Sequence, residues 1–161
     1  LYYDVNYRAS HKAEIMKITP NLIENLEYAD IVRGSSDDFS ILYRMPEAQR
    51  VYASEISFYC KKFICTDGAN PIEVRAEDGF GKAYDVPKND RVVSTIGAGD
   101  SFNAGFIYGL VKNDITKADI RHGLSEAQWD RCIASGLRFS AESCKDIYNY
   151  ISKEYGAGLE K

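Results

Sequence analysis

The fold is decided by the stretch Val92-Val93-Ser94-Thr95-Ile96-Gly97-Ala98-Gly99-Asp100-Ser101-Phe102-Asn103-Ala104-Gly105-Phe106, which changes character in its middle. A β-branched run stops at two glycines, one carboxylate follows, and small and aromatic residues continue after it. We therefore expect a strand at 91–95, a loop at 97–99 and a helix at 100–112. Backbone N–H groups at a glycine loop that leads into a helix commonly bind phosphate. Asp100 needs another explanation, because a carboxylate repels phosphate.

Composition indicates a globular domain and excludes several function classes. The 161 residues are 45% apolar and 27% charged, with a net charge of −4 that offers no electrostatic footprint for nucleic acid. The apolar run at 104–111 is too short to span a membrane. Four cysteines without C-x-x-C spacing, together with only two histidines, argue against a zinc site. Free thiols fit a cytoplasmic location.

Strand patterns alternate with helix patterns along the rest of the chain. We expect strands at 1–5, 30–33 and 62–66, a hairpin that joins 72–76 to 82–86, and a helix that starts with Thr19 as N-cap and Pro20 behind it. This alternation predicts an α/β fold with a mostly parallel sheet covered on both faces. Ligands bind beyond the carboxyl ends of such strands, which favours the loops at 6–8, 34–36 and 97–99.

The glycine loop does not fit two common nucleotide motifs. A P-loop needs a lysine after its last glycine, and none follows Gly99. A dinucleotide fingerprint needs a third glycine where Phe102 stands. Asp100 can instead accept the proton of an attacking hydroxyl while nearby backbone amides hold the phosphoryl charge. The alternative is that Asp100 merely caps the helix and that the glycines only form a turn.

These residues resemble the PfkB (ribokinase-like) carbohydrate kinases, whose C-terminal signature has the usual form D-T-x-G-A-G-D-x-F-x-A-G. The corresponding residues here are Ser94-Thr95-Ile96-Gly97-Ala98-Gly99-Asp100-Ser101-Phe102 with Ala104-Gly105. Three further segments agree with the family in order and spacing. Residues 3–8 (YDVNYR) resemble its F-D-x-N-x-R strand end, 29–39 (ADIVRGSSDDF) its "aDivkgNxxEf" segment, and 65–69 (CTDGA) its "vTxGxxG" strand end.

The resemblance implies a role for each loop residue. Asp100 would be the catalytic base that deprotonates the sugar hydroxyl. The amides of Gly97, Ala98 and Gly99 would form the anion hole for the γ-phosphoryl group. The implied cofactors are ATP and Mg²⁺, and the implied substrate is a small-molecule sugar.

The resemblance also implies a nucleotide-binding set. Thr66 and Gly68 would line the phosphate and ribose region, and Arg8 would help with phosphate or substrate charge. The family's N-x-x-E pair, which helps to organise magnesium and the phosphates, corresponds to Ser35 and Asp38, so that Asp38 is the candidate metal residue. From the residues alone, Ser35 to Asp38 fit an N-cap with first-turn acids.

Two departures from the family pattern affect cation handling. N-x-x-E has become Ser35-x-x-Asp38, which keeps acceptor oxygens but shortens their reach. The first aspartate of the signature is Ser94 here. In relatives that aspartate often helps to hold a monovalent cation, so Ser94 argues against activation by potassium.

The implied architecture is a three-layer ribokinase-like sheet with helices on both faces. Residues 1–161 would form the C-terminal, nucleotide-binding half of a single kinase domain. The chain opens on Leu1-Tyr2-Tyr3-Asp4-Val5, which has the pattern of a buried strand and lacks an initiator methionine. We therefore expect an N-terminal half of the same protein, with lid and sugar site, as the missing partner. A homodimer is left open.

The leading hypothesis is ATP-dependent phosphoryl transfer to a sugar hydroxyl, most like the fructokinase branch. A nucleoside or sugar-acid kinase of the same fold is the nearest alternative, with Arg8 pairing to a sugar-acid carboxylate. Two alternatives belong to other functional classes: a non-catalytic nucleotide-binding module and a dinucleotide-binding oxidoreductase domain. The missing third glycine and the carboxylate of Asp100 argue against the oxidoreductase.

Overall fold

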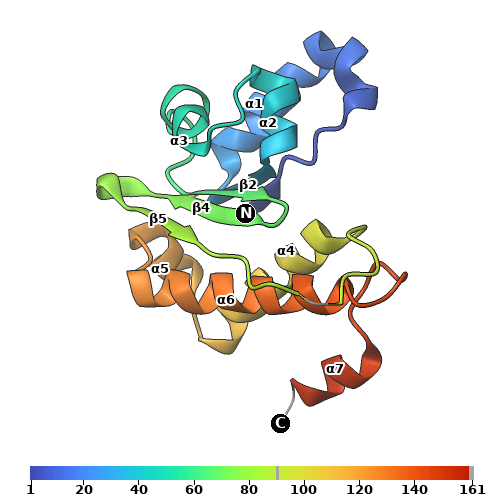
Figure 1. The fold of residues 1–161 in the computed structure, drawn as a ribbon. Helices are drawn as coiled ribbons and strands as arrows, with labels where there is room; N and C mark the ends of the chain where they lie inside the picture. Colours follow the sequence, from blue (N-terminus) through green and yellow to red (C-terminus); the bar gives the residue numbers. More distant parts are fainter. Residues whose placement is uncertain (90, 160–161) are drawn as a thin grey trace. The chain divides into compact units, whose positions relative to one another are not determined.

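A computed structural model describes residues 1–89 and 91–159 of the chain. The chain divides into two compact units, Leu1–Val86 and Pro87–Lys161. The first unit carries the sheet, and the second is helical (Figure 1). Each unit is described by itself.

Unit 1 contains a five-stranded sheet with the order β1-β2-β3-β4-β5. The first three strands are parallel, and β3, β4 and β5 pair antiparallel. The α/β expectation and the hairpin are thus confirmed, but the sheet is mixed rather than mostly parallel, because the hairpin adds two antiparallel pairings to the two parallel ones. The strands are β1 (Tyr2–Asp4), β2 (Ile31–Ser35), β3 (Phe63–Asp67), β4 (Asn70–Arg75) and β5 (Gly81–Tyr84).

Helices connect the parallel strands of unit 1, and one of them starts earlier than expected. The predicted start at Thr19 and Pro20 is wrong, because Pro20 lies inside α1 and the Thr19 hydroxyl donates to the Ile15 carbonyl at 2.7 Å. A 3₁₀ helix at 9–14 leads directly into this helix, which begins at Ile15. The elements are η1 (Ala9–Glu14), α1 (Ile15–Tyr28), α2 (Ser36–Tyr43), α3 (Ala48–Val51), η2 (Tyr52–Ile56) and η3 (Glu77–Gly79).

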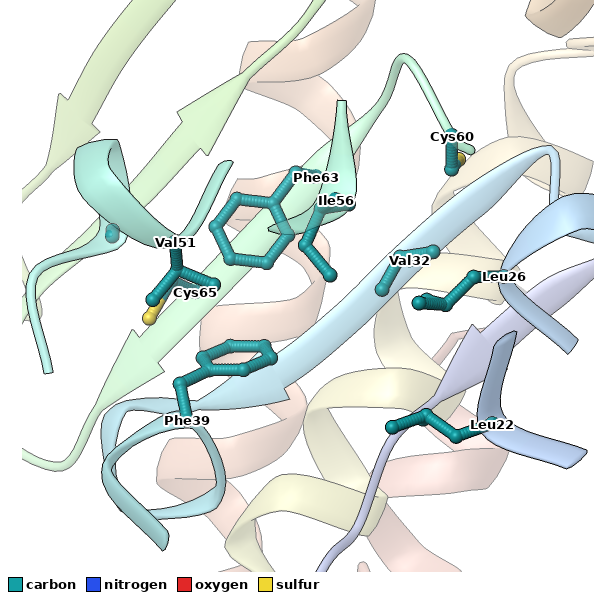
Figure 2. Close-up of a cluster of buried hydrophobic side chains, with 10 residues drawn as sticks. Leu22, Leu26, Val32, Phe39, Val51, Ile56, Cys60, Phe63 and Cys65 are labelled. Carbon is teal, nitrogen blue, oxygen red and sulfur yellow. The ribbon is translucent and has the colours of Figure 1, made fainter. Parts of the chain in front are cut away.

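The core of unit 1 lies between the sheet and the helices α1, α2 and α3 (Figure 2). Phe39 of α2 packs on Phe63 of β3, with ring centroids 5.2 Å apart, and Val32 of β2 is fully buried beside them. The alternate residues Ile31 and Ile64 lie on the opposite face and are buried as well. Apolar side chains on both faces explain why these strands read as continuous hydrophobic runs.

Unit 2 is built on the helix pair α4 (Ala98–Lys112) and α6 (Glu126–Ser143), which run side by side (Figure 1). A β-carbon at Gly105 would stand 2.7 Å from the Ser135 carbonyl oxygen, so the small residue lets the helices approach closely. Two short helices complete the unit, α5 (Lys117–His122) and α7 (Lys153–Gly158). Among the described residues, no helix has the length and apolar character needed to cross a membrane.

The strand expected at 91–95 is wrong. This segment forms no ladder, and the Val93 N–H donates to the Cys144 carbonyl at the end of α6, at 2.8 Å. Val92 and Val93 remain 55% and 51% exposed. A β-branched run predicts a strand only where a partner strand is available, and this segment is tied to a helix end instead.

Candidate functional site

The glycine loop of unit 2 forms the N-terminus of α4. Gly97 is the N-cap, with a positive φ of 79° that favours glycine, and the Ser101 N–H donates to the Gly97 carbonyl at 2.8 Å. The first amides of a helix have no partner within it, here those of Ala98, Gly99 and Asp100. The Ala98 N–H donates to the Thr95 carbonyl at 3.2 Å. The loop therefore presents backbone donors at the positive end of a helix dipole.

Asp100 occupies the third position of α4, and its side chain is exposed. The alternative that it caps the helix has no support in the geometry. Gly97 is the N-cap, and within the described part of unit 2 no side-chain hydrogen bond caps this helix. The carboxylate is thus not used in a capping box. An exposed carboxylate beside backbone donors is able to accept a proton.

Asp38 occupies the same third position in α2, and there the capping box is formed. Its Oδ2 accepts from the Ser35 N–H and from the Ser35 hydroxyl, both at 2.7 Å, while the Asp38 N–H donates to Ser35 Oγ at 3.1 Å. The structure therefore confirms that Ser35 is the N-cap of α2 and that Asp38 completes its capping box. Asp38 is 7% exposed.

The described residues offer magnesium isolated carboxylates rather than a dedicated cage of ligands. Among the described residues there is no group of three or more histidine, cysteine or acidic side chains that would hold a metal. Mg²⁺ commonly uses one or two protein carboxylates and completes its octahedron with water and phosphate oxygens. Asp38 fits such an arrangement, because a carboxylate has about four lone-pair sites and the capping box uses only its Oδ2.

A buried cation links the carboxyl ends of the three parallel strands. Arg33 of β2 donates from Nη1 to both carboxylate oxygens of Asp4 in β1, at 3.1 and 3.3 Å. From Nη2 it donates to the hydroxyl of Thr66 in β3, at 2.5 Å. The sequence analysis did not single out Arg33. The available signal was a charged residue within the otherwise apolar stretch 31–34.

Thr66 and Gly68 lie where β3 leads into the hairpin. Thr66 is half-buried, and Gly68 is exposed with a φ of 57°. Between them, Asp67 accepts hydrogen bonds from the Ser36 hydroxyl and the Asn70 side chain, which fixes the turn. The neighbouring Cys65 is buried, and burial raises its pKa to about 12, so that it is a neutral thiol rather than a nucleophile at neutral pH.

Two expected site residues lie outside these networks. Arg8 stands in extended backbone before η1 with an exposed side chain, and its carbonyl accepts from the His11 N–H at 2.9 Å. Ser94 is half-buried, and its hydroxyl accepts from the Ile96 N–H at 3.2 Å. A hydroxyl used in this way shapes the approach to the glycine loop and carries no charge for a cation.

The family follows from a match that covers almost all of the sequence. The model of the pfkB family carbohydrate kinases matches residues 2–152. The chain belongs to the PfkB family. The fold of this PfkB chain is similar to that of aminoimidazole riboside kinase from Salmonella enterica, with a TM-score of 0.75 at 20% identity over 99% of this chain and 52% of that chain. This likeness shows the ribokinase-like α/β fold.

Two further relatives of the PfkB chain differ in their named substrates. Fructokinase from Vibrio cholerae has a TM-score of 0.72 at 17% identity, over 92% of this chain and 45% of that chain. Adenosine kinase 2 from Arabidopsis thaliana is 36% identical over 89 residues, which are 53% of this chain and 23% of the relative. The chain thus spans about half the length of these solved structures and about a quarter of the curated relative.

Proposed function

We propose that this chain belongs to an ATP-dependent kinase that transfers a phosphoryl group to a sugar hydroxyl. The supporting observation is the glycine loop at the start of α4, where Asp100 is exposed and free of a capping box beside backbone donors. In this proposal Asp100 takes the proton of the acceptor hydroxyl. The amides of Gly97 and Gly99, joined by that of Ala98 once it leaves the Thr95 carbonyl, hold the developing charge on the transferred group.

The nucleotide is assigned to residues of unit 1. Thr66 and Gly68 contact its phosphates and ribose, Arg8 supplies positive charge, and Ser35 and Asp38 organise the phosphates. Bound magnesium supplies neutralisation of phosphate charge, and Asp38 is the residue that would hold it, directly or through water. The assignment is supported by the match of the family segments and by the acceptor capacity left on the Asp38 carboxylate.

A nucleoside is the second candidate acceptor. This alternative is favoured by the 36% identity to an adenosine kinase over 89 residues. A nucleoside still presents a sugar hydroxyl, so the base and the amides keep their roles. The other candidate acceptors are a free sugar of the fructokinase type and a sugar acid.

The test is a substrate panel on the intact protein with ATP and Mg²⁺. The panel contains fructose, ribose, a sugar acid, adenosine and aminoimidazole riboside, and ADP formation is followed while the product is weighed by mass spectrometry. The proposal expects one class to be phosphorylated at least tenfold faster than background. Nucleotide binding without phosphorylation of any acceptor would support a non-catalytic module, and tight NADH binding without a response to ATP would support an oxidoreductase domain.

A further inference from the structure

Arg33 stands in the middle strand of the parallel part of the sheet and reaches both neighbouring strands. Asp4 is its register partner in β1. On the other side its register partner is Ile64, and Thr66 lies two residues further toward the carboxyl end of β3, on the same face. One guanidinium therefore contacts a carboxylate and a hydroxyl at the end of the sheet where ligands of such folds bind.

The direction of the Arg33–Thr66 hydrogen bond decides what the hydroxyl can do. Arginine has only donors, so Thr66 Oγ1 must be the acceptor of this 2.5 Å bond. A hydroxyl has one proton, and the bond from Arg33 leaves that proton to be donated elsewhere. Accepting from a cation also polarises the hydroxyl and strengthens it as a donor. Thr66 thus needs an acceptor oxygen, and its half-buried position leaves it accessible.

We propose that Arg33 is a positioning residue that fixes the Thr66 hydroxyl as a donor to a phosphate oxygen of the bound nucleotide. The inference rests on the proposed function, because it takes a nucleotide phosphate to be the ligand. Asp4 holds the guanidinium in place and lowers its net charge, so that Arg33 acts through Thr66. Arg33 itself is 7% exposed, and its Nε has no hydrogen-bond partner among the described residues. A buried polar atom without a partner costs stability, so its presence calls for a reason other than the stability of the sheet.

A purely structural role for Arg33 predicts a different behaviour. In that case the ion pair with Asp4 would stabilise the sheet, and its loss would change stability but not nucleotide affinity in the folded protein. The chain offers a matched control in Lys62, which is 5% exposed just before β3 and pairs with Glu77. Lys62 is a buried cation of the same sheet, but it lies at the amino end of β3, away from Thr66.

The experiment is a double-mutant cycle on nucleotide binding to the intact protein. ADP affinity is measured by calorimetry for Arg33→Met, Thr66→Val and the double variant, together with KM for ATP, kcat and the melting temperature. Each single variant should weaken ADP binding roughly 10- to 100-fold, the worth of one hydrogen bond to a charged group. The double variant should be no weaker than the singles, since both remove the same contact. KM for ATP should rise by more than kcat falls.

Two controls separate this role from a loss of folding. Thr66→Ser keeps the hydroxyl and should retain most of the affinity, whereas Lys62→Met should lower the melting temperature and leave ADP affinity unchanged. Should Arg33→Met fail to fold, Arg33→Lys replaces it, because lysine keeps the charge but lacks the planar fork whose two arms contact Asp4 and Thr66, and it should show the same loss of affinity. An unchanged ADP affinity in the Arg33 variant, or a double variant whose loss is the product of the two single losses, would overturn the inference.

The proposed function fails in a distinguishable way. If the unmodified protein neither binds ADP nor forms it from ATP, the proposed function falls and this inference falls with it. If the unmodified protein binds ADP and the Arg33 variant binds it equally well, only the inference falls.

Discussion

Gly97 lies so close to Asn149 that a β-carbon at position 97 would stand 2.7 Å from the Asn149 carbonyl oxygen. The segment that follows α6 therefore packs on the glycine loop of unit 2. Gly97 also has a φ of 79°, which side chains rarely adopt. Two independent constraints, space and backbone conformation, thus require glycine at the N-cap of α4.

The first prediction is that Gly97→Ala destabilises unit 2. The strained φ and the contact with Asn149 should together lower the free energy of unfolding by roughly 1–3 kcal/mol. Urea unfolding followed by circular dichroism measures this loss.

Gly156→Ala is the matched control for this substitution. Gly156 lies in α7 of the same unit, and nothing lies within 4 Å of the place its β-carbon would take. This variant should be neutral or slightly stabilising, since alanine is the better helix former. Equal unfolding curves for Gly97→Ala and the unmodified protein would contradict the packing of the loop.

The second prediction separates the capping role of Asp38 from its proposed role with magnesium. Asp38→Asn keeps an oxygen that accepts from the Ser35 N–H, so the helix cap should largely survive. The loss of the carboxylate charge should raise the Mg²⁺ concentration for half-maximal activity roughly tenfold. A magnesium titration of ADP formation in the intact protein checks this.

The chain contains a second capping box for comparison. In α5 the Asp119 Oδ2 accepts from the Thr116 N–H and hydroxyl at 2.7 and 2.6 Å, the same arrangement as at Ser35 and Asp38. Asp119→Asn should leave the magnesium dependence unchanged. If the Mg²⁺ concentration for half-maximal activity rises equally in both variants, or rises in neither, Asp38 serves only as a helix cap.

The third prediction concerns stability at alkaline pH. Burial raises the pKa of Cys65 to about 12 and that of Cys132 to about 11, from an ordinary value of 9.0. These thiols keep their protons in the folded state, while the unfolded chain loses them above pH 9. The unfolded state then binds fewer protons, so stability is full below pH 9 and falls as pH rises toward 11–12.

Each buried thiol contributes a slope of up to about 1.4 kcal/mol per pH unit. Urea midpoints measured between pH 8 and pH 10 should therefore decrease, and Cys65→Ala should make the decrease shallower. Tyr2 and Tyr43 also have pKa values raised by burial, but ordinary tyrosine titrates near 10, so they add mainly above this range. Constant stability from pH 8 to pH 10 would show that the thiols are not buried as described.

The sequence predicted those elements whose signals are local. The helix predicted at 100–112 ends at Lys112 in the structure, and Ser125 and Gln128, which have the spacing of a capping box, form one at the start of α6. The parallel strands were visible because buried strands are mostly apolar, with Arg33 as the charged exception in β2. These predictions hold because the short-range hydrogen bonds and the hydrophobic burial of each element favour the same structure.

Most of the misses share one physical cause, which is partner choice over long sequence separations. Nothing local shows that residues 91–95 bond to the end of α6 rather than to a strand. The same holds for the site. The spacing pointed to Thr66 and Asp38, but the contact of Thr66 with Arg33 joins residues 33 positions apart. The start of α1 is a different, local miss, because the helix continues through Pro20 instead of beginning there.

The central claim is that Asp100 is the base for phosphoryl transfer, and Asp100→Asn tests it most directly. The control is Glu154→Gln, which changes another exposed first-turn acid of unit 2. The measurement is kcat for the best acceptor of the panel, together with ADP affinity by calorimetry. We predict that kcat falls about 10²- to 10⁴-fold in Asp100→Asn while ADP affinity is retained, and that Glu154→Gln is unchanged. A kcat for Asp100→Asn within about threefold of the unmodified protein, well short of the worth of a positioned base, would contradict the account.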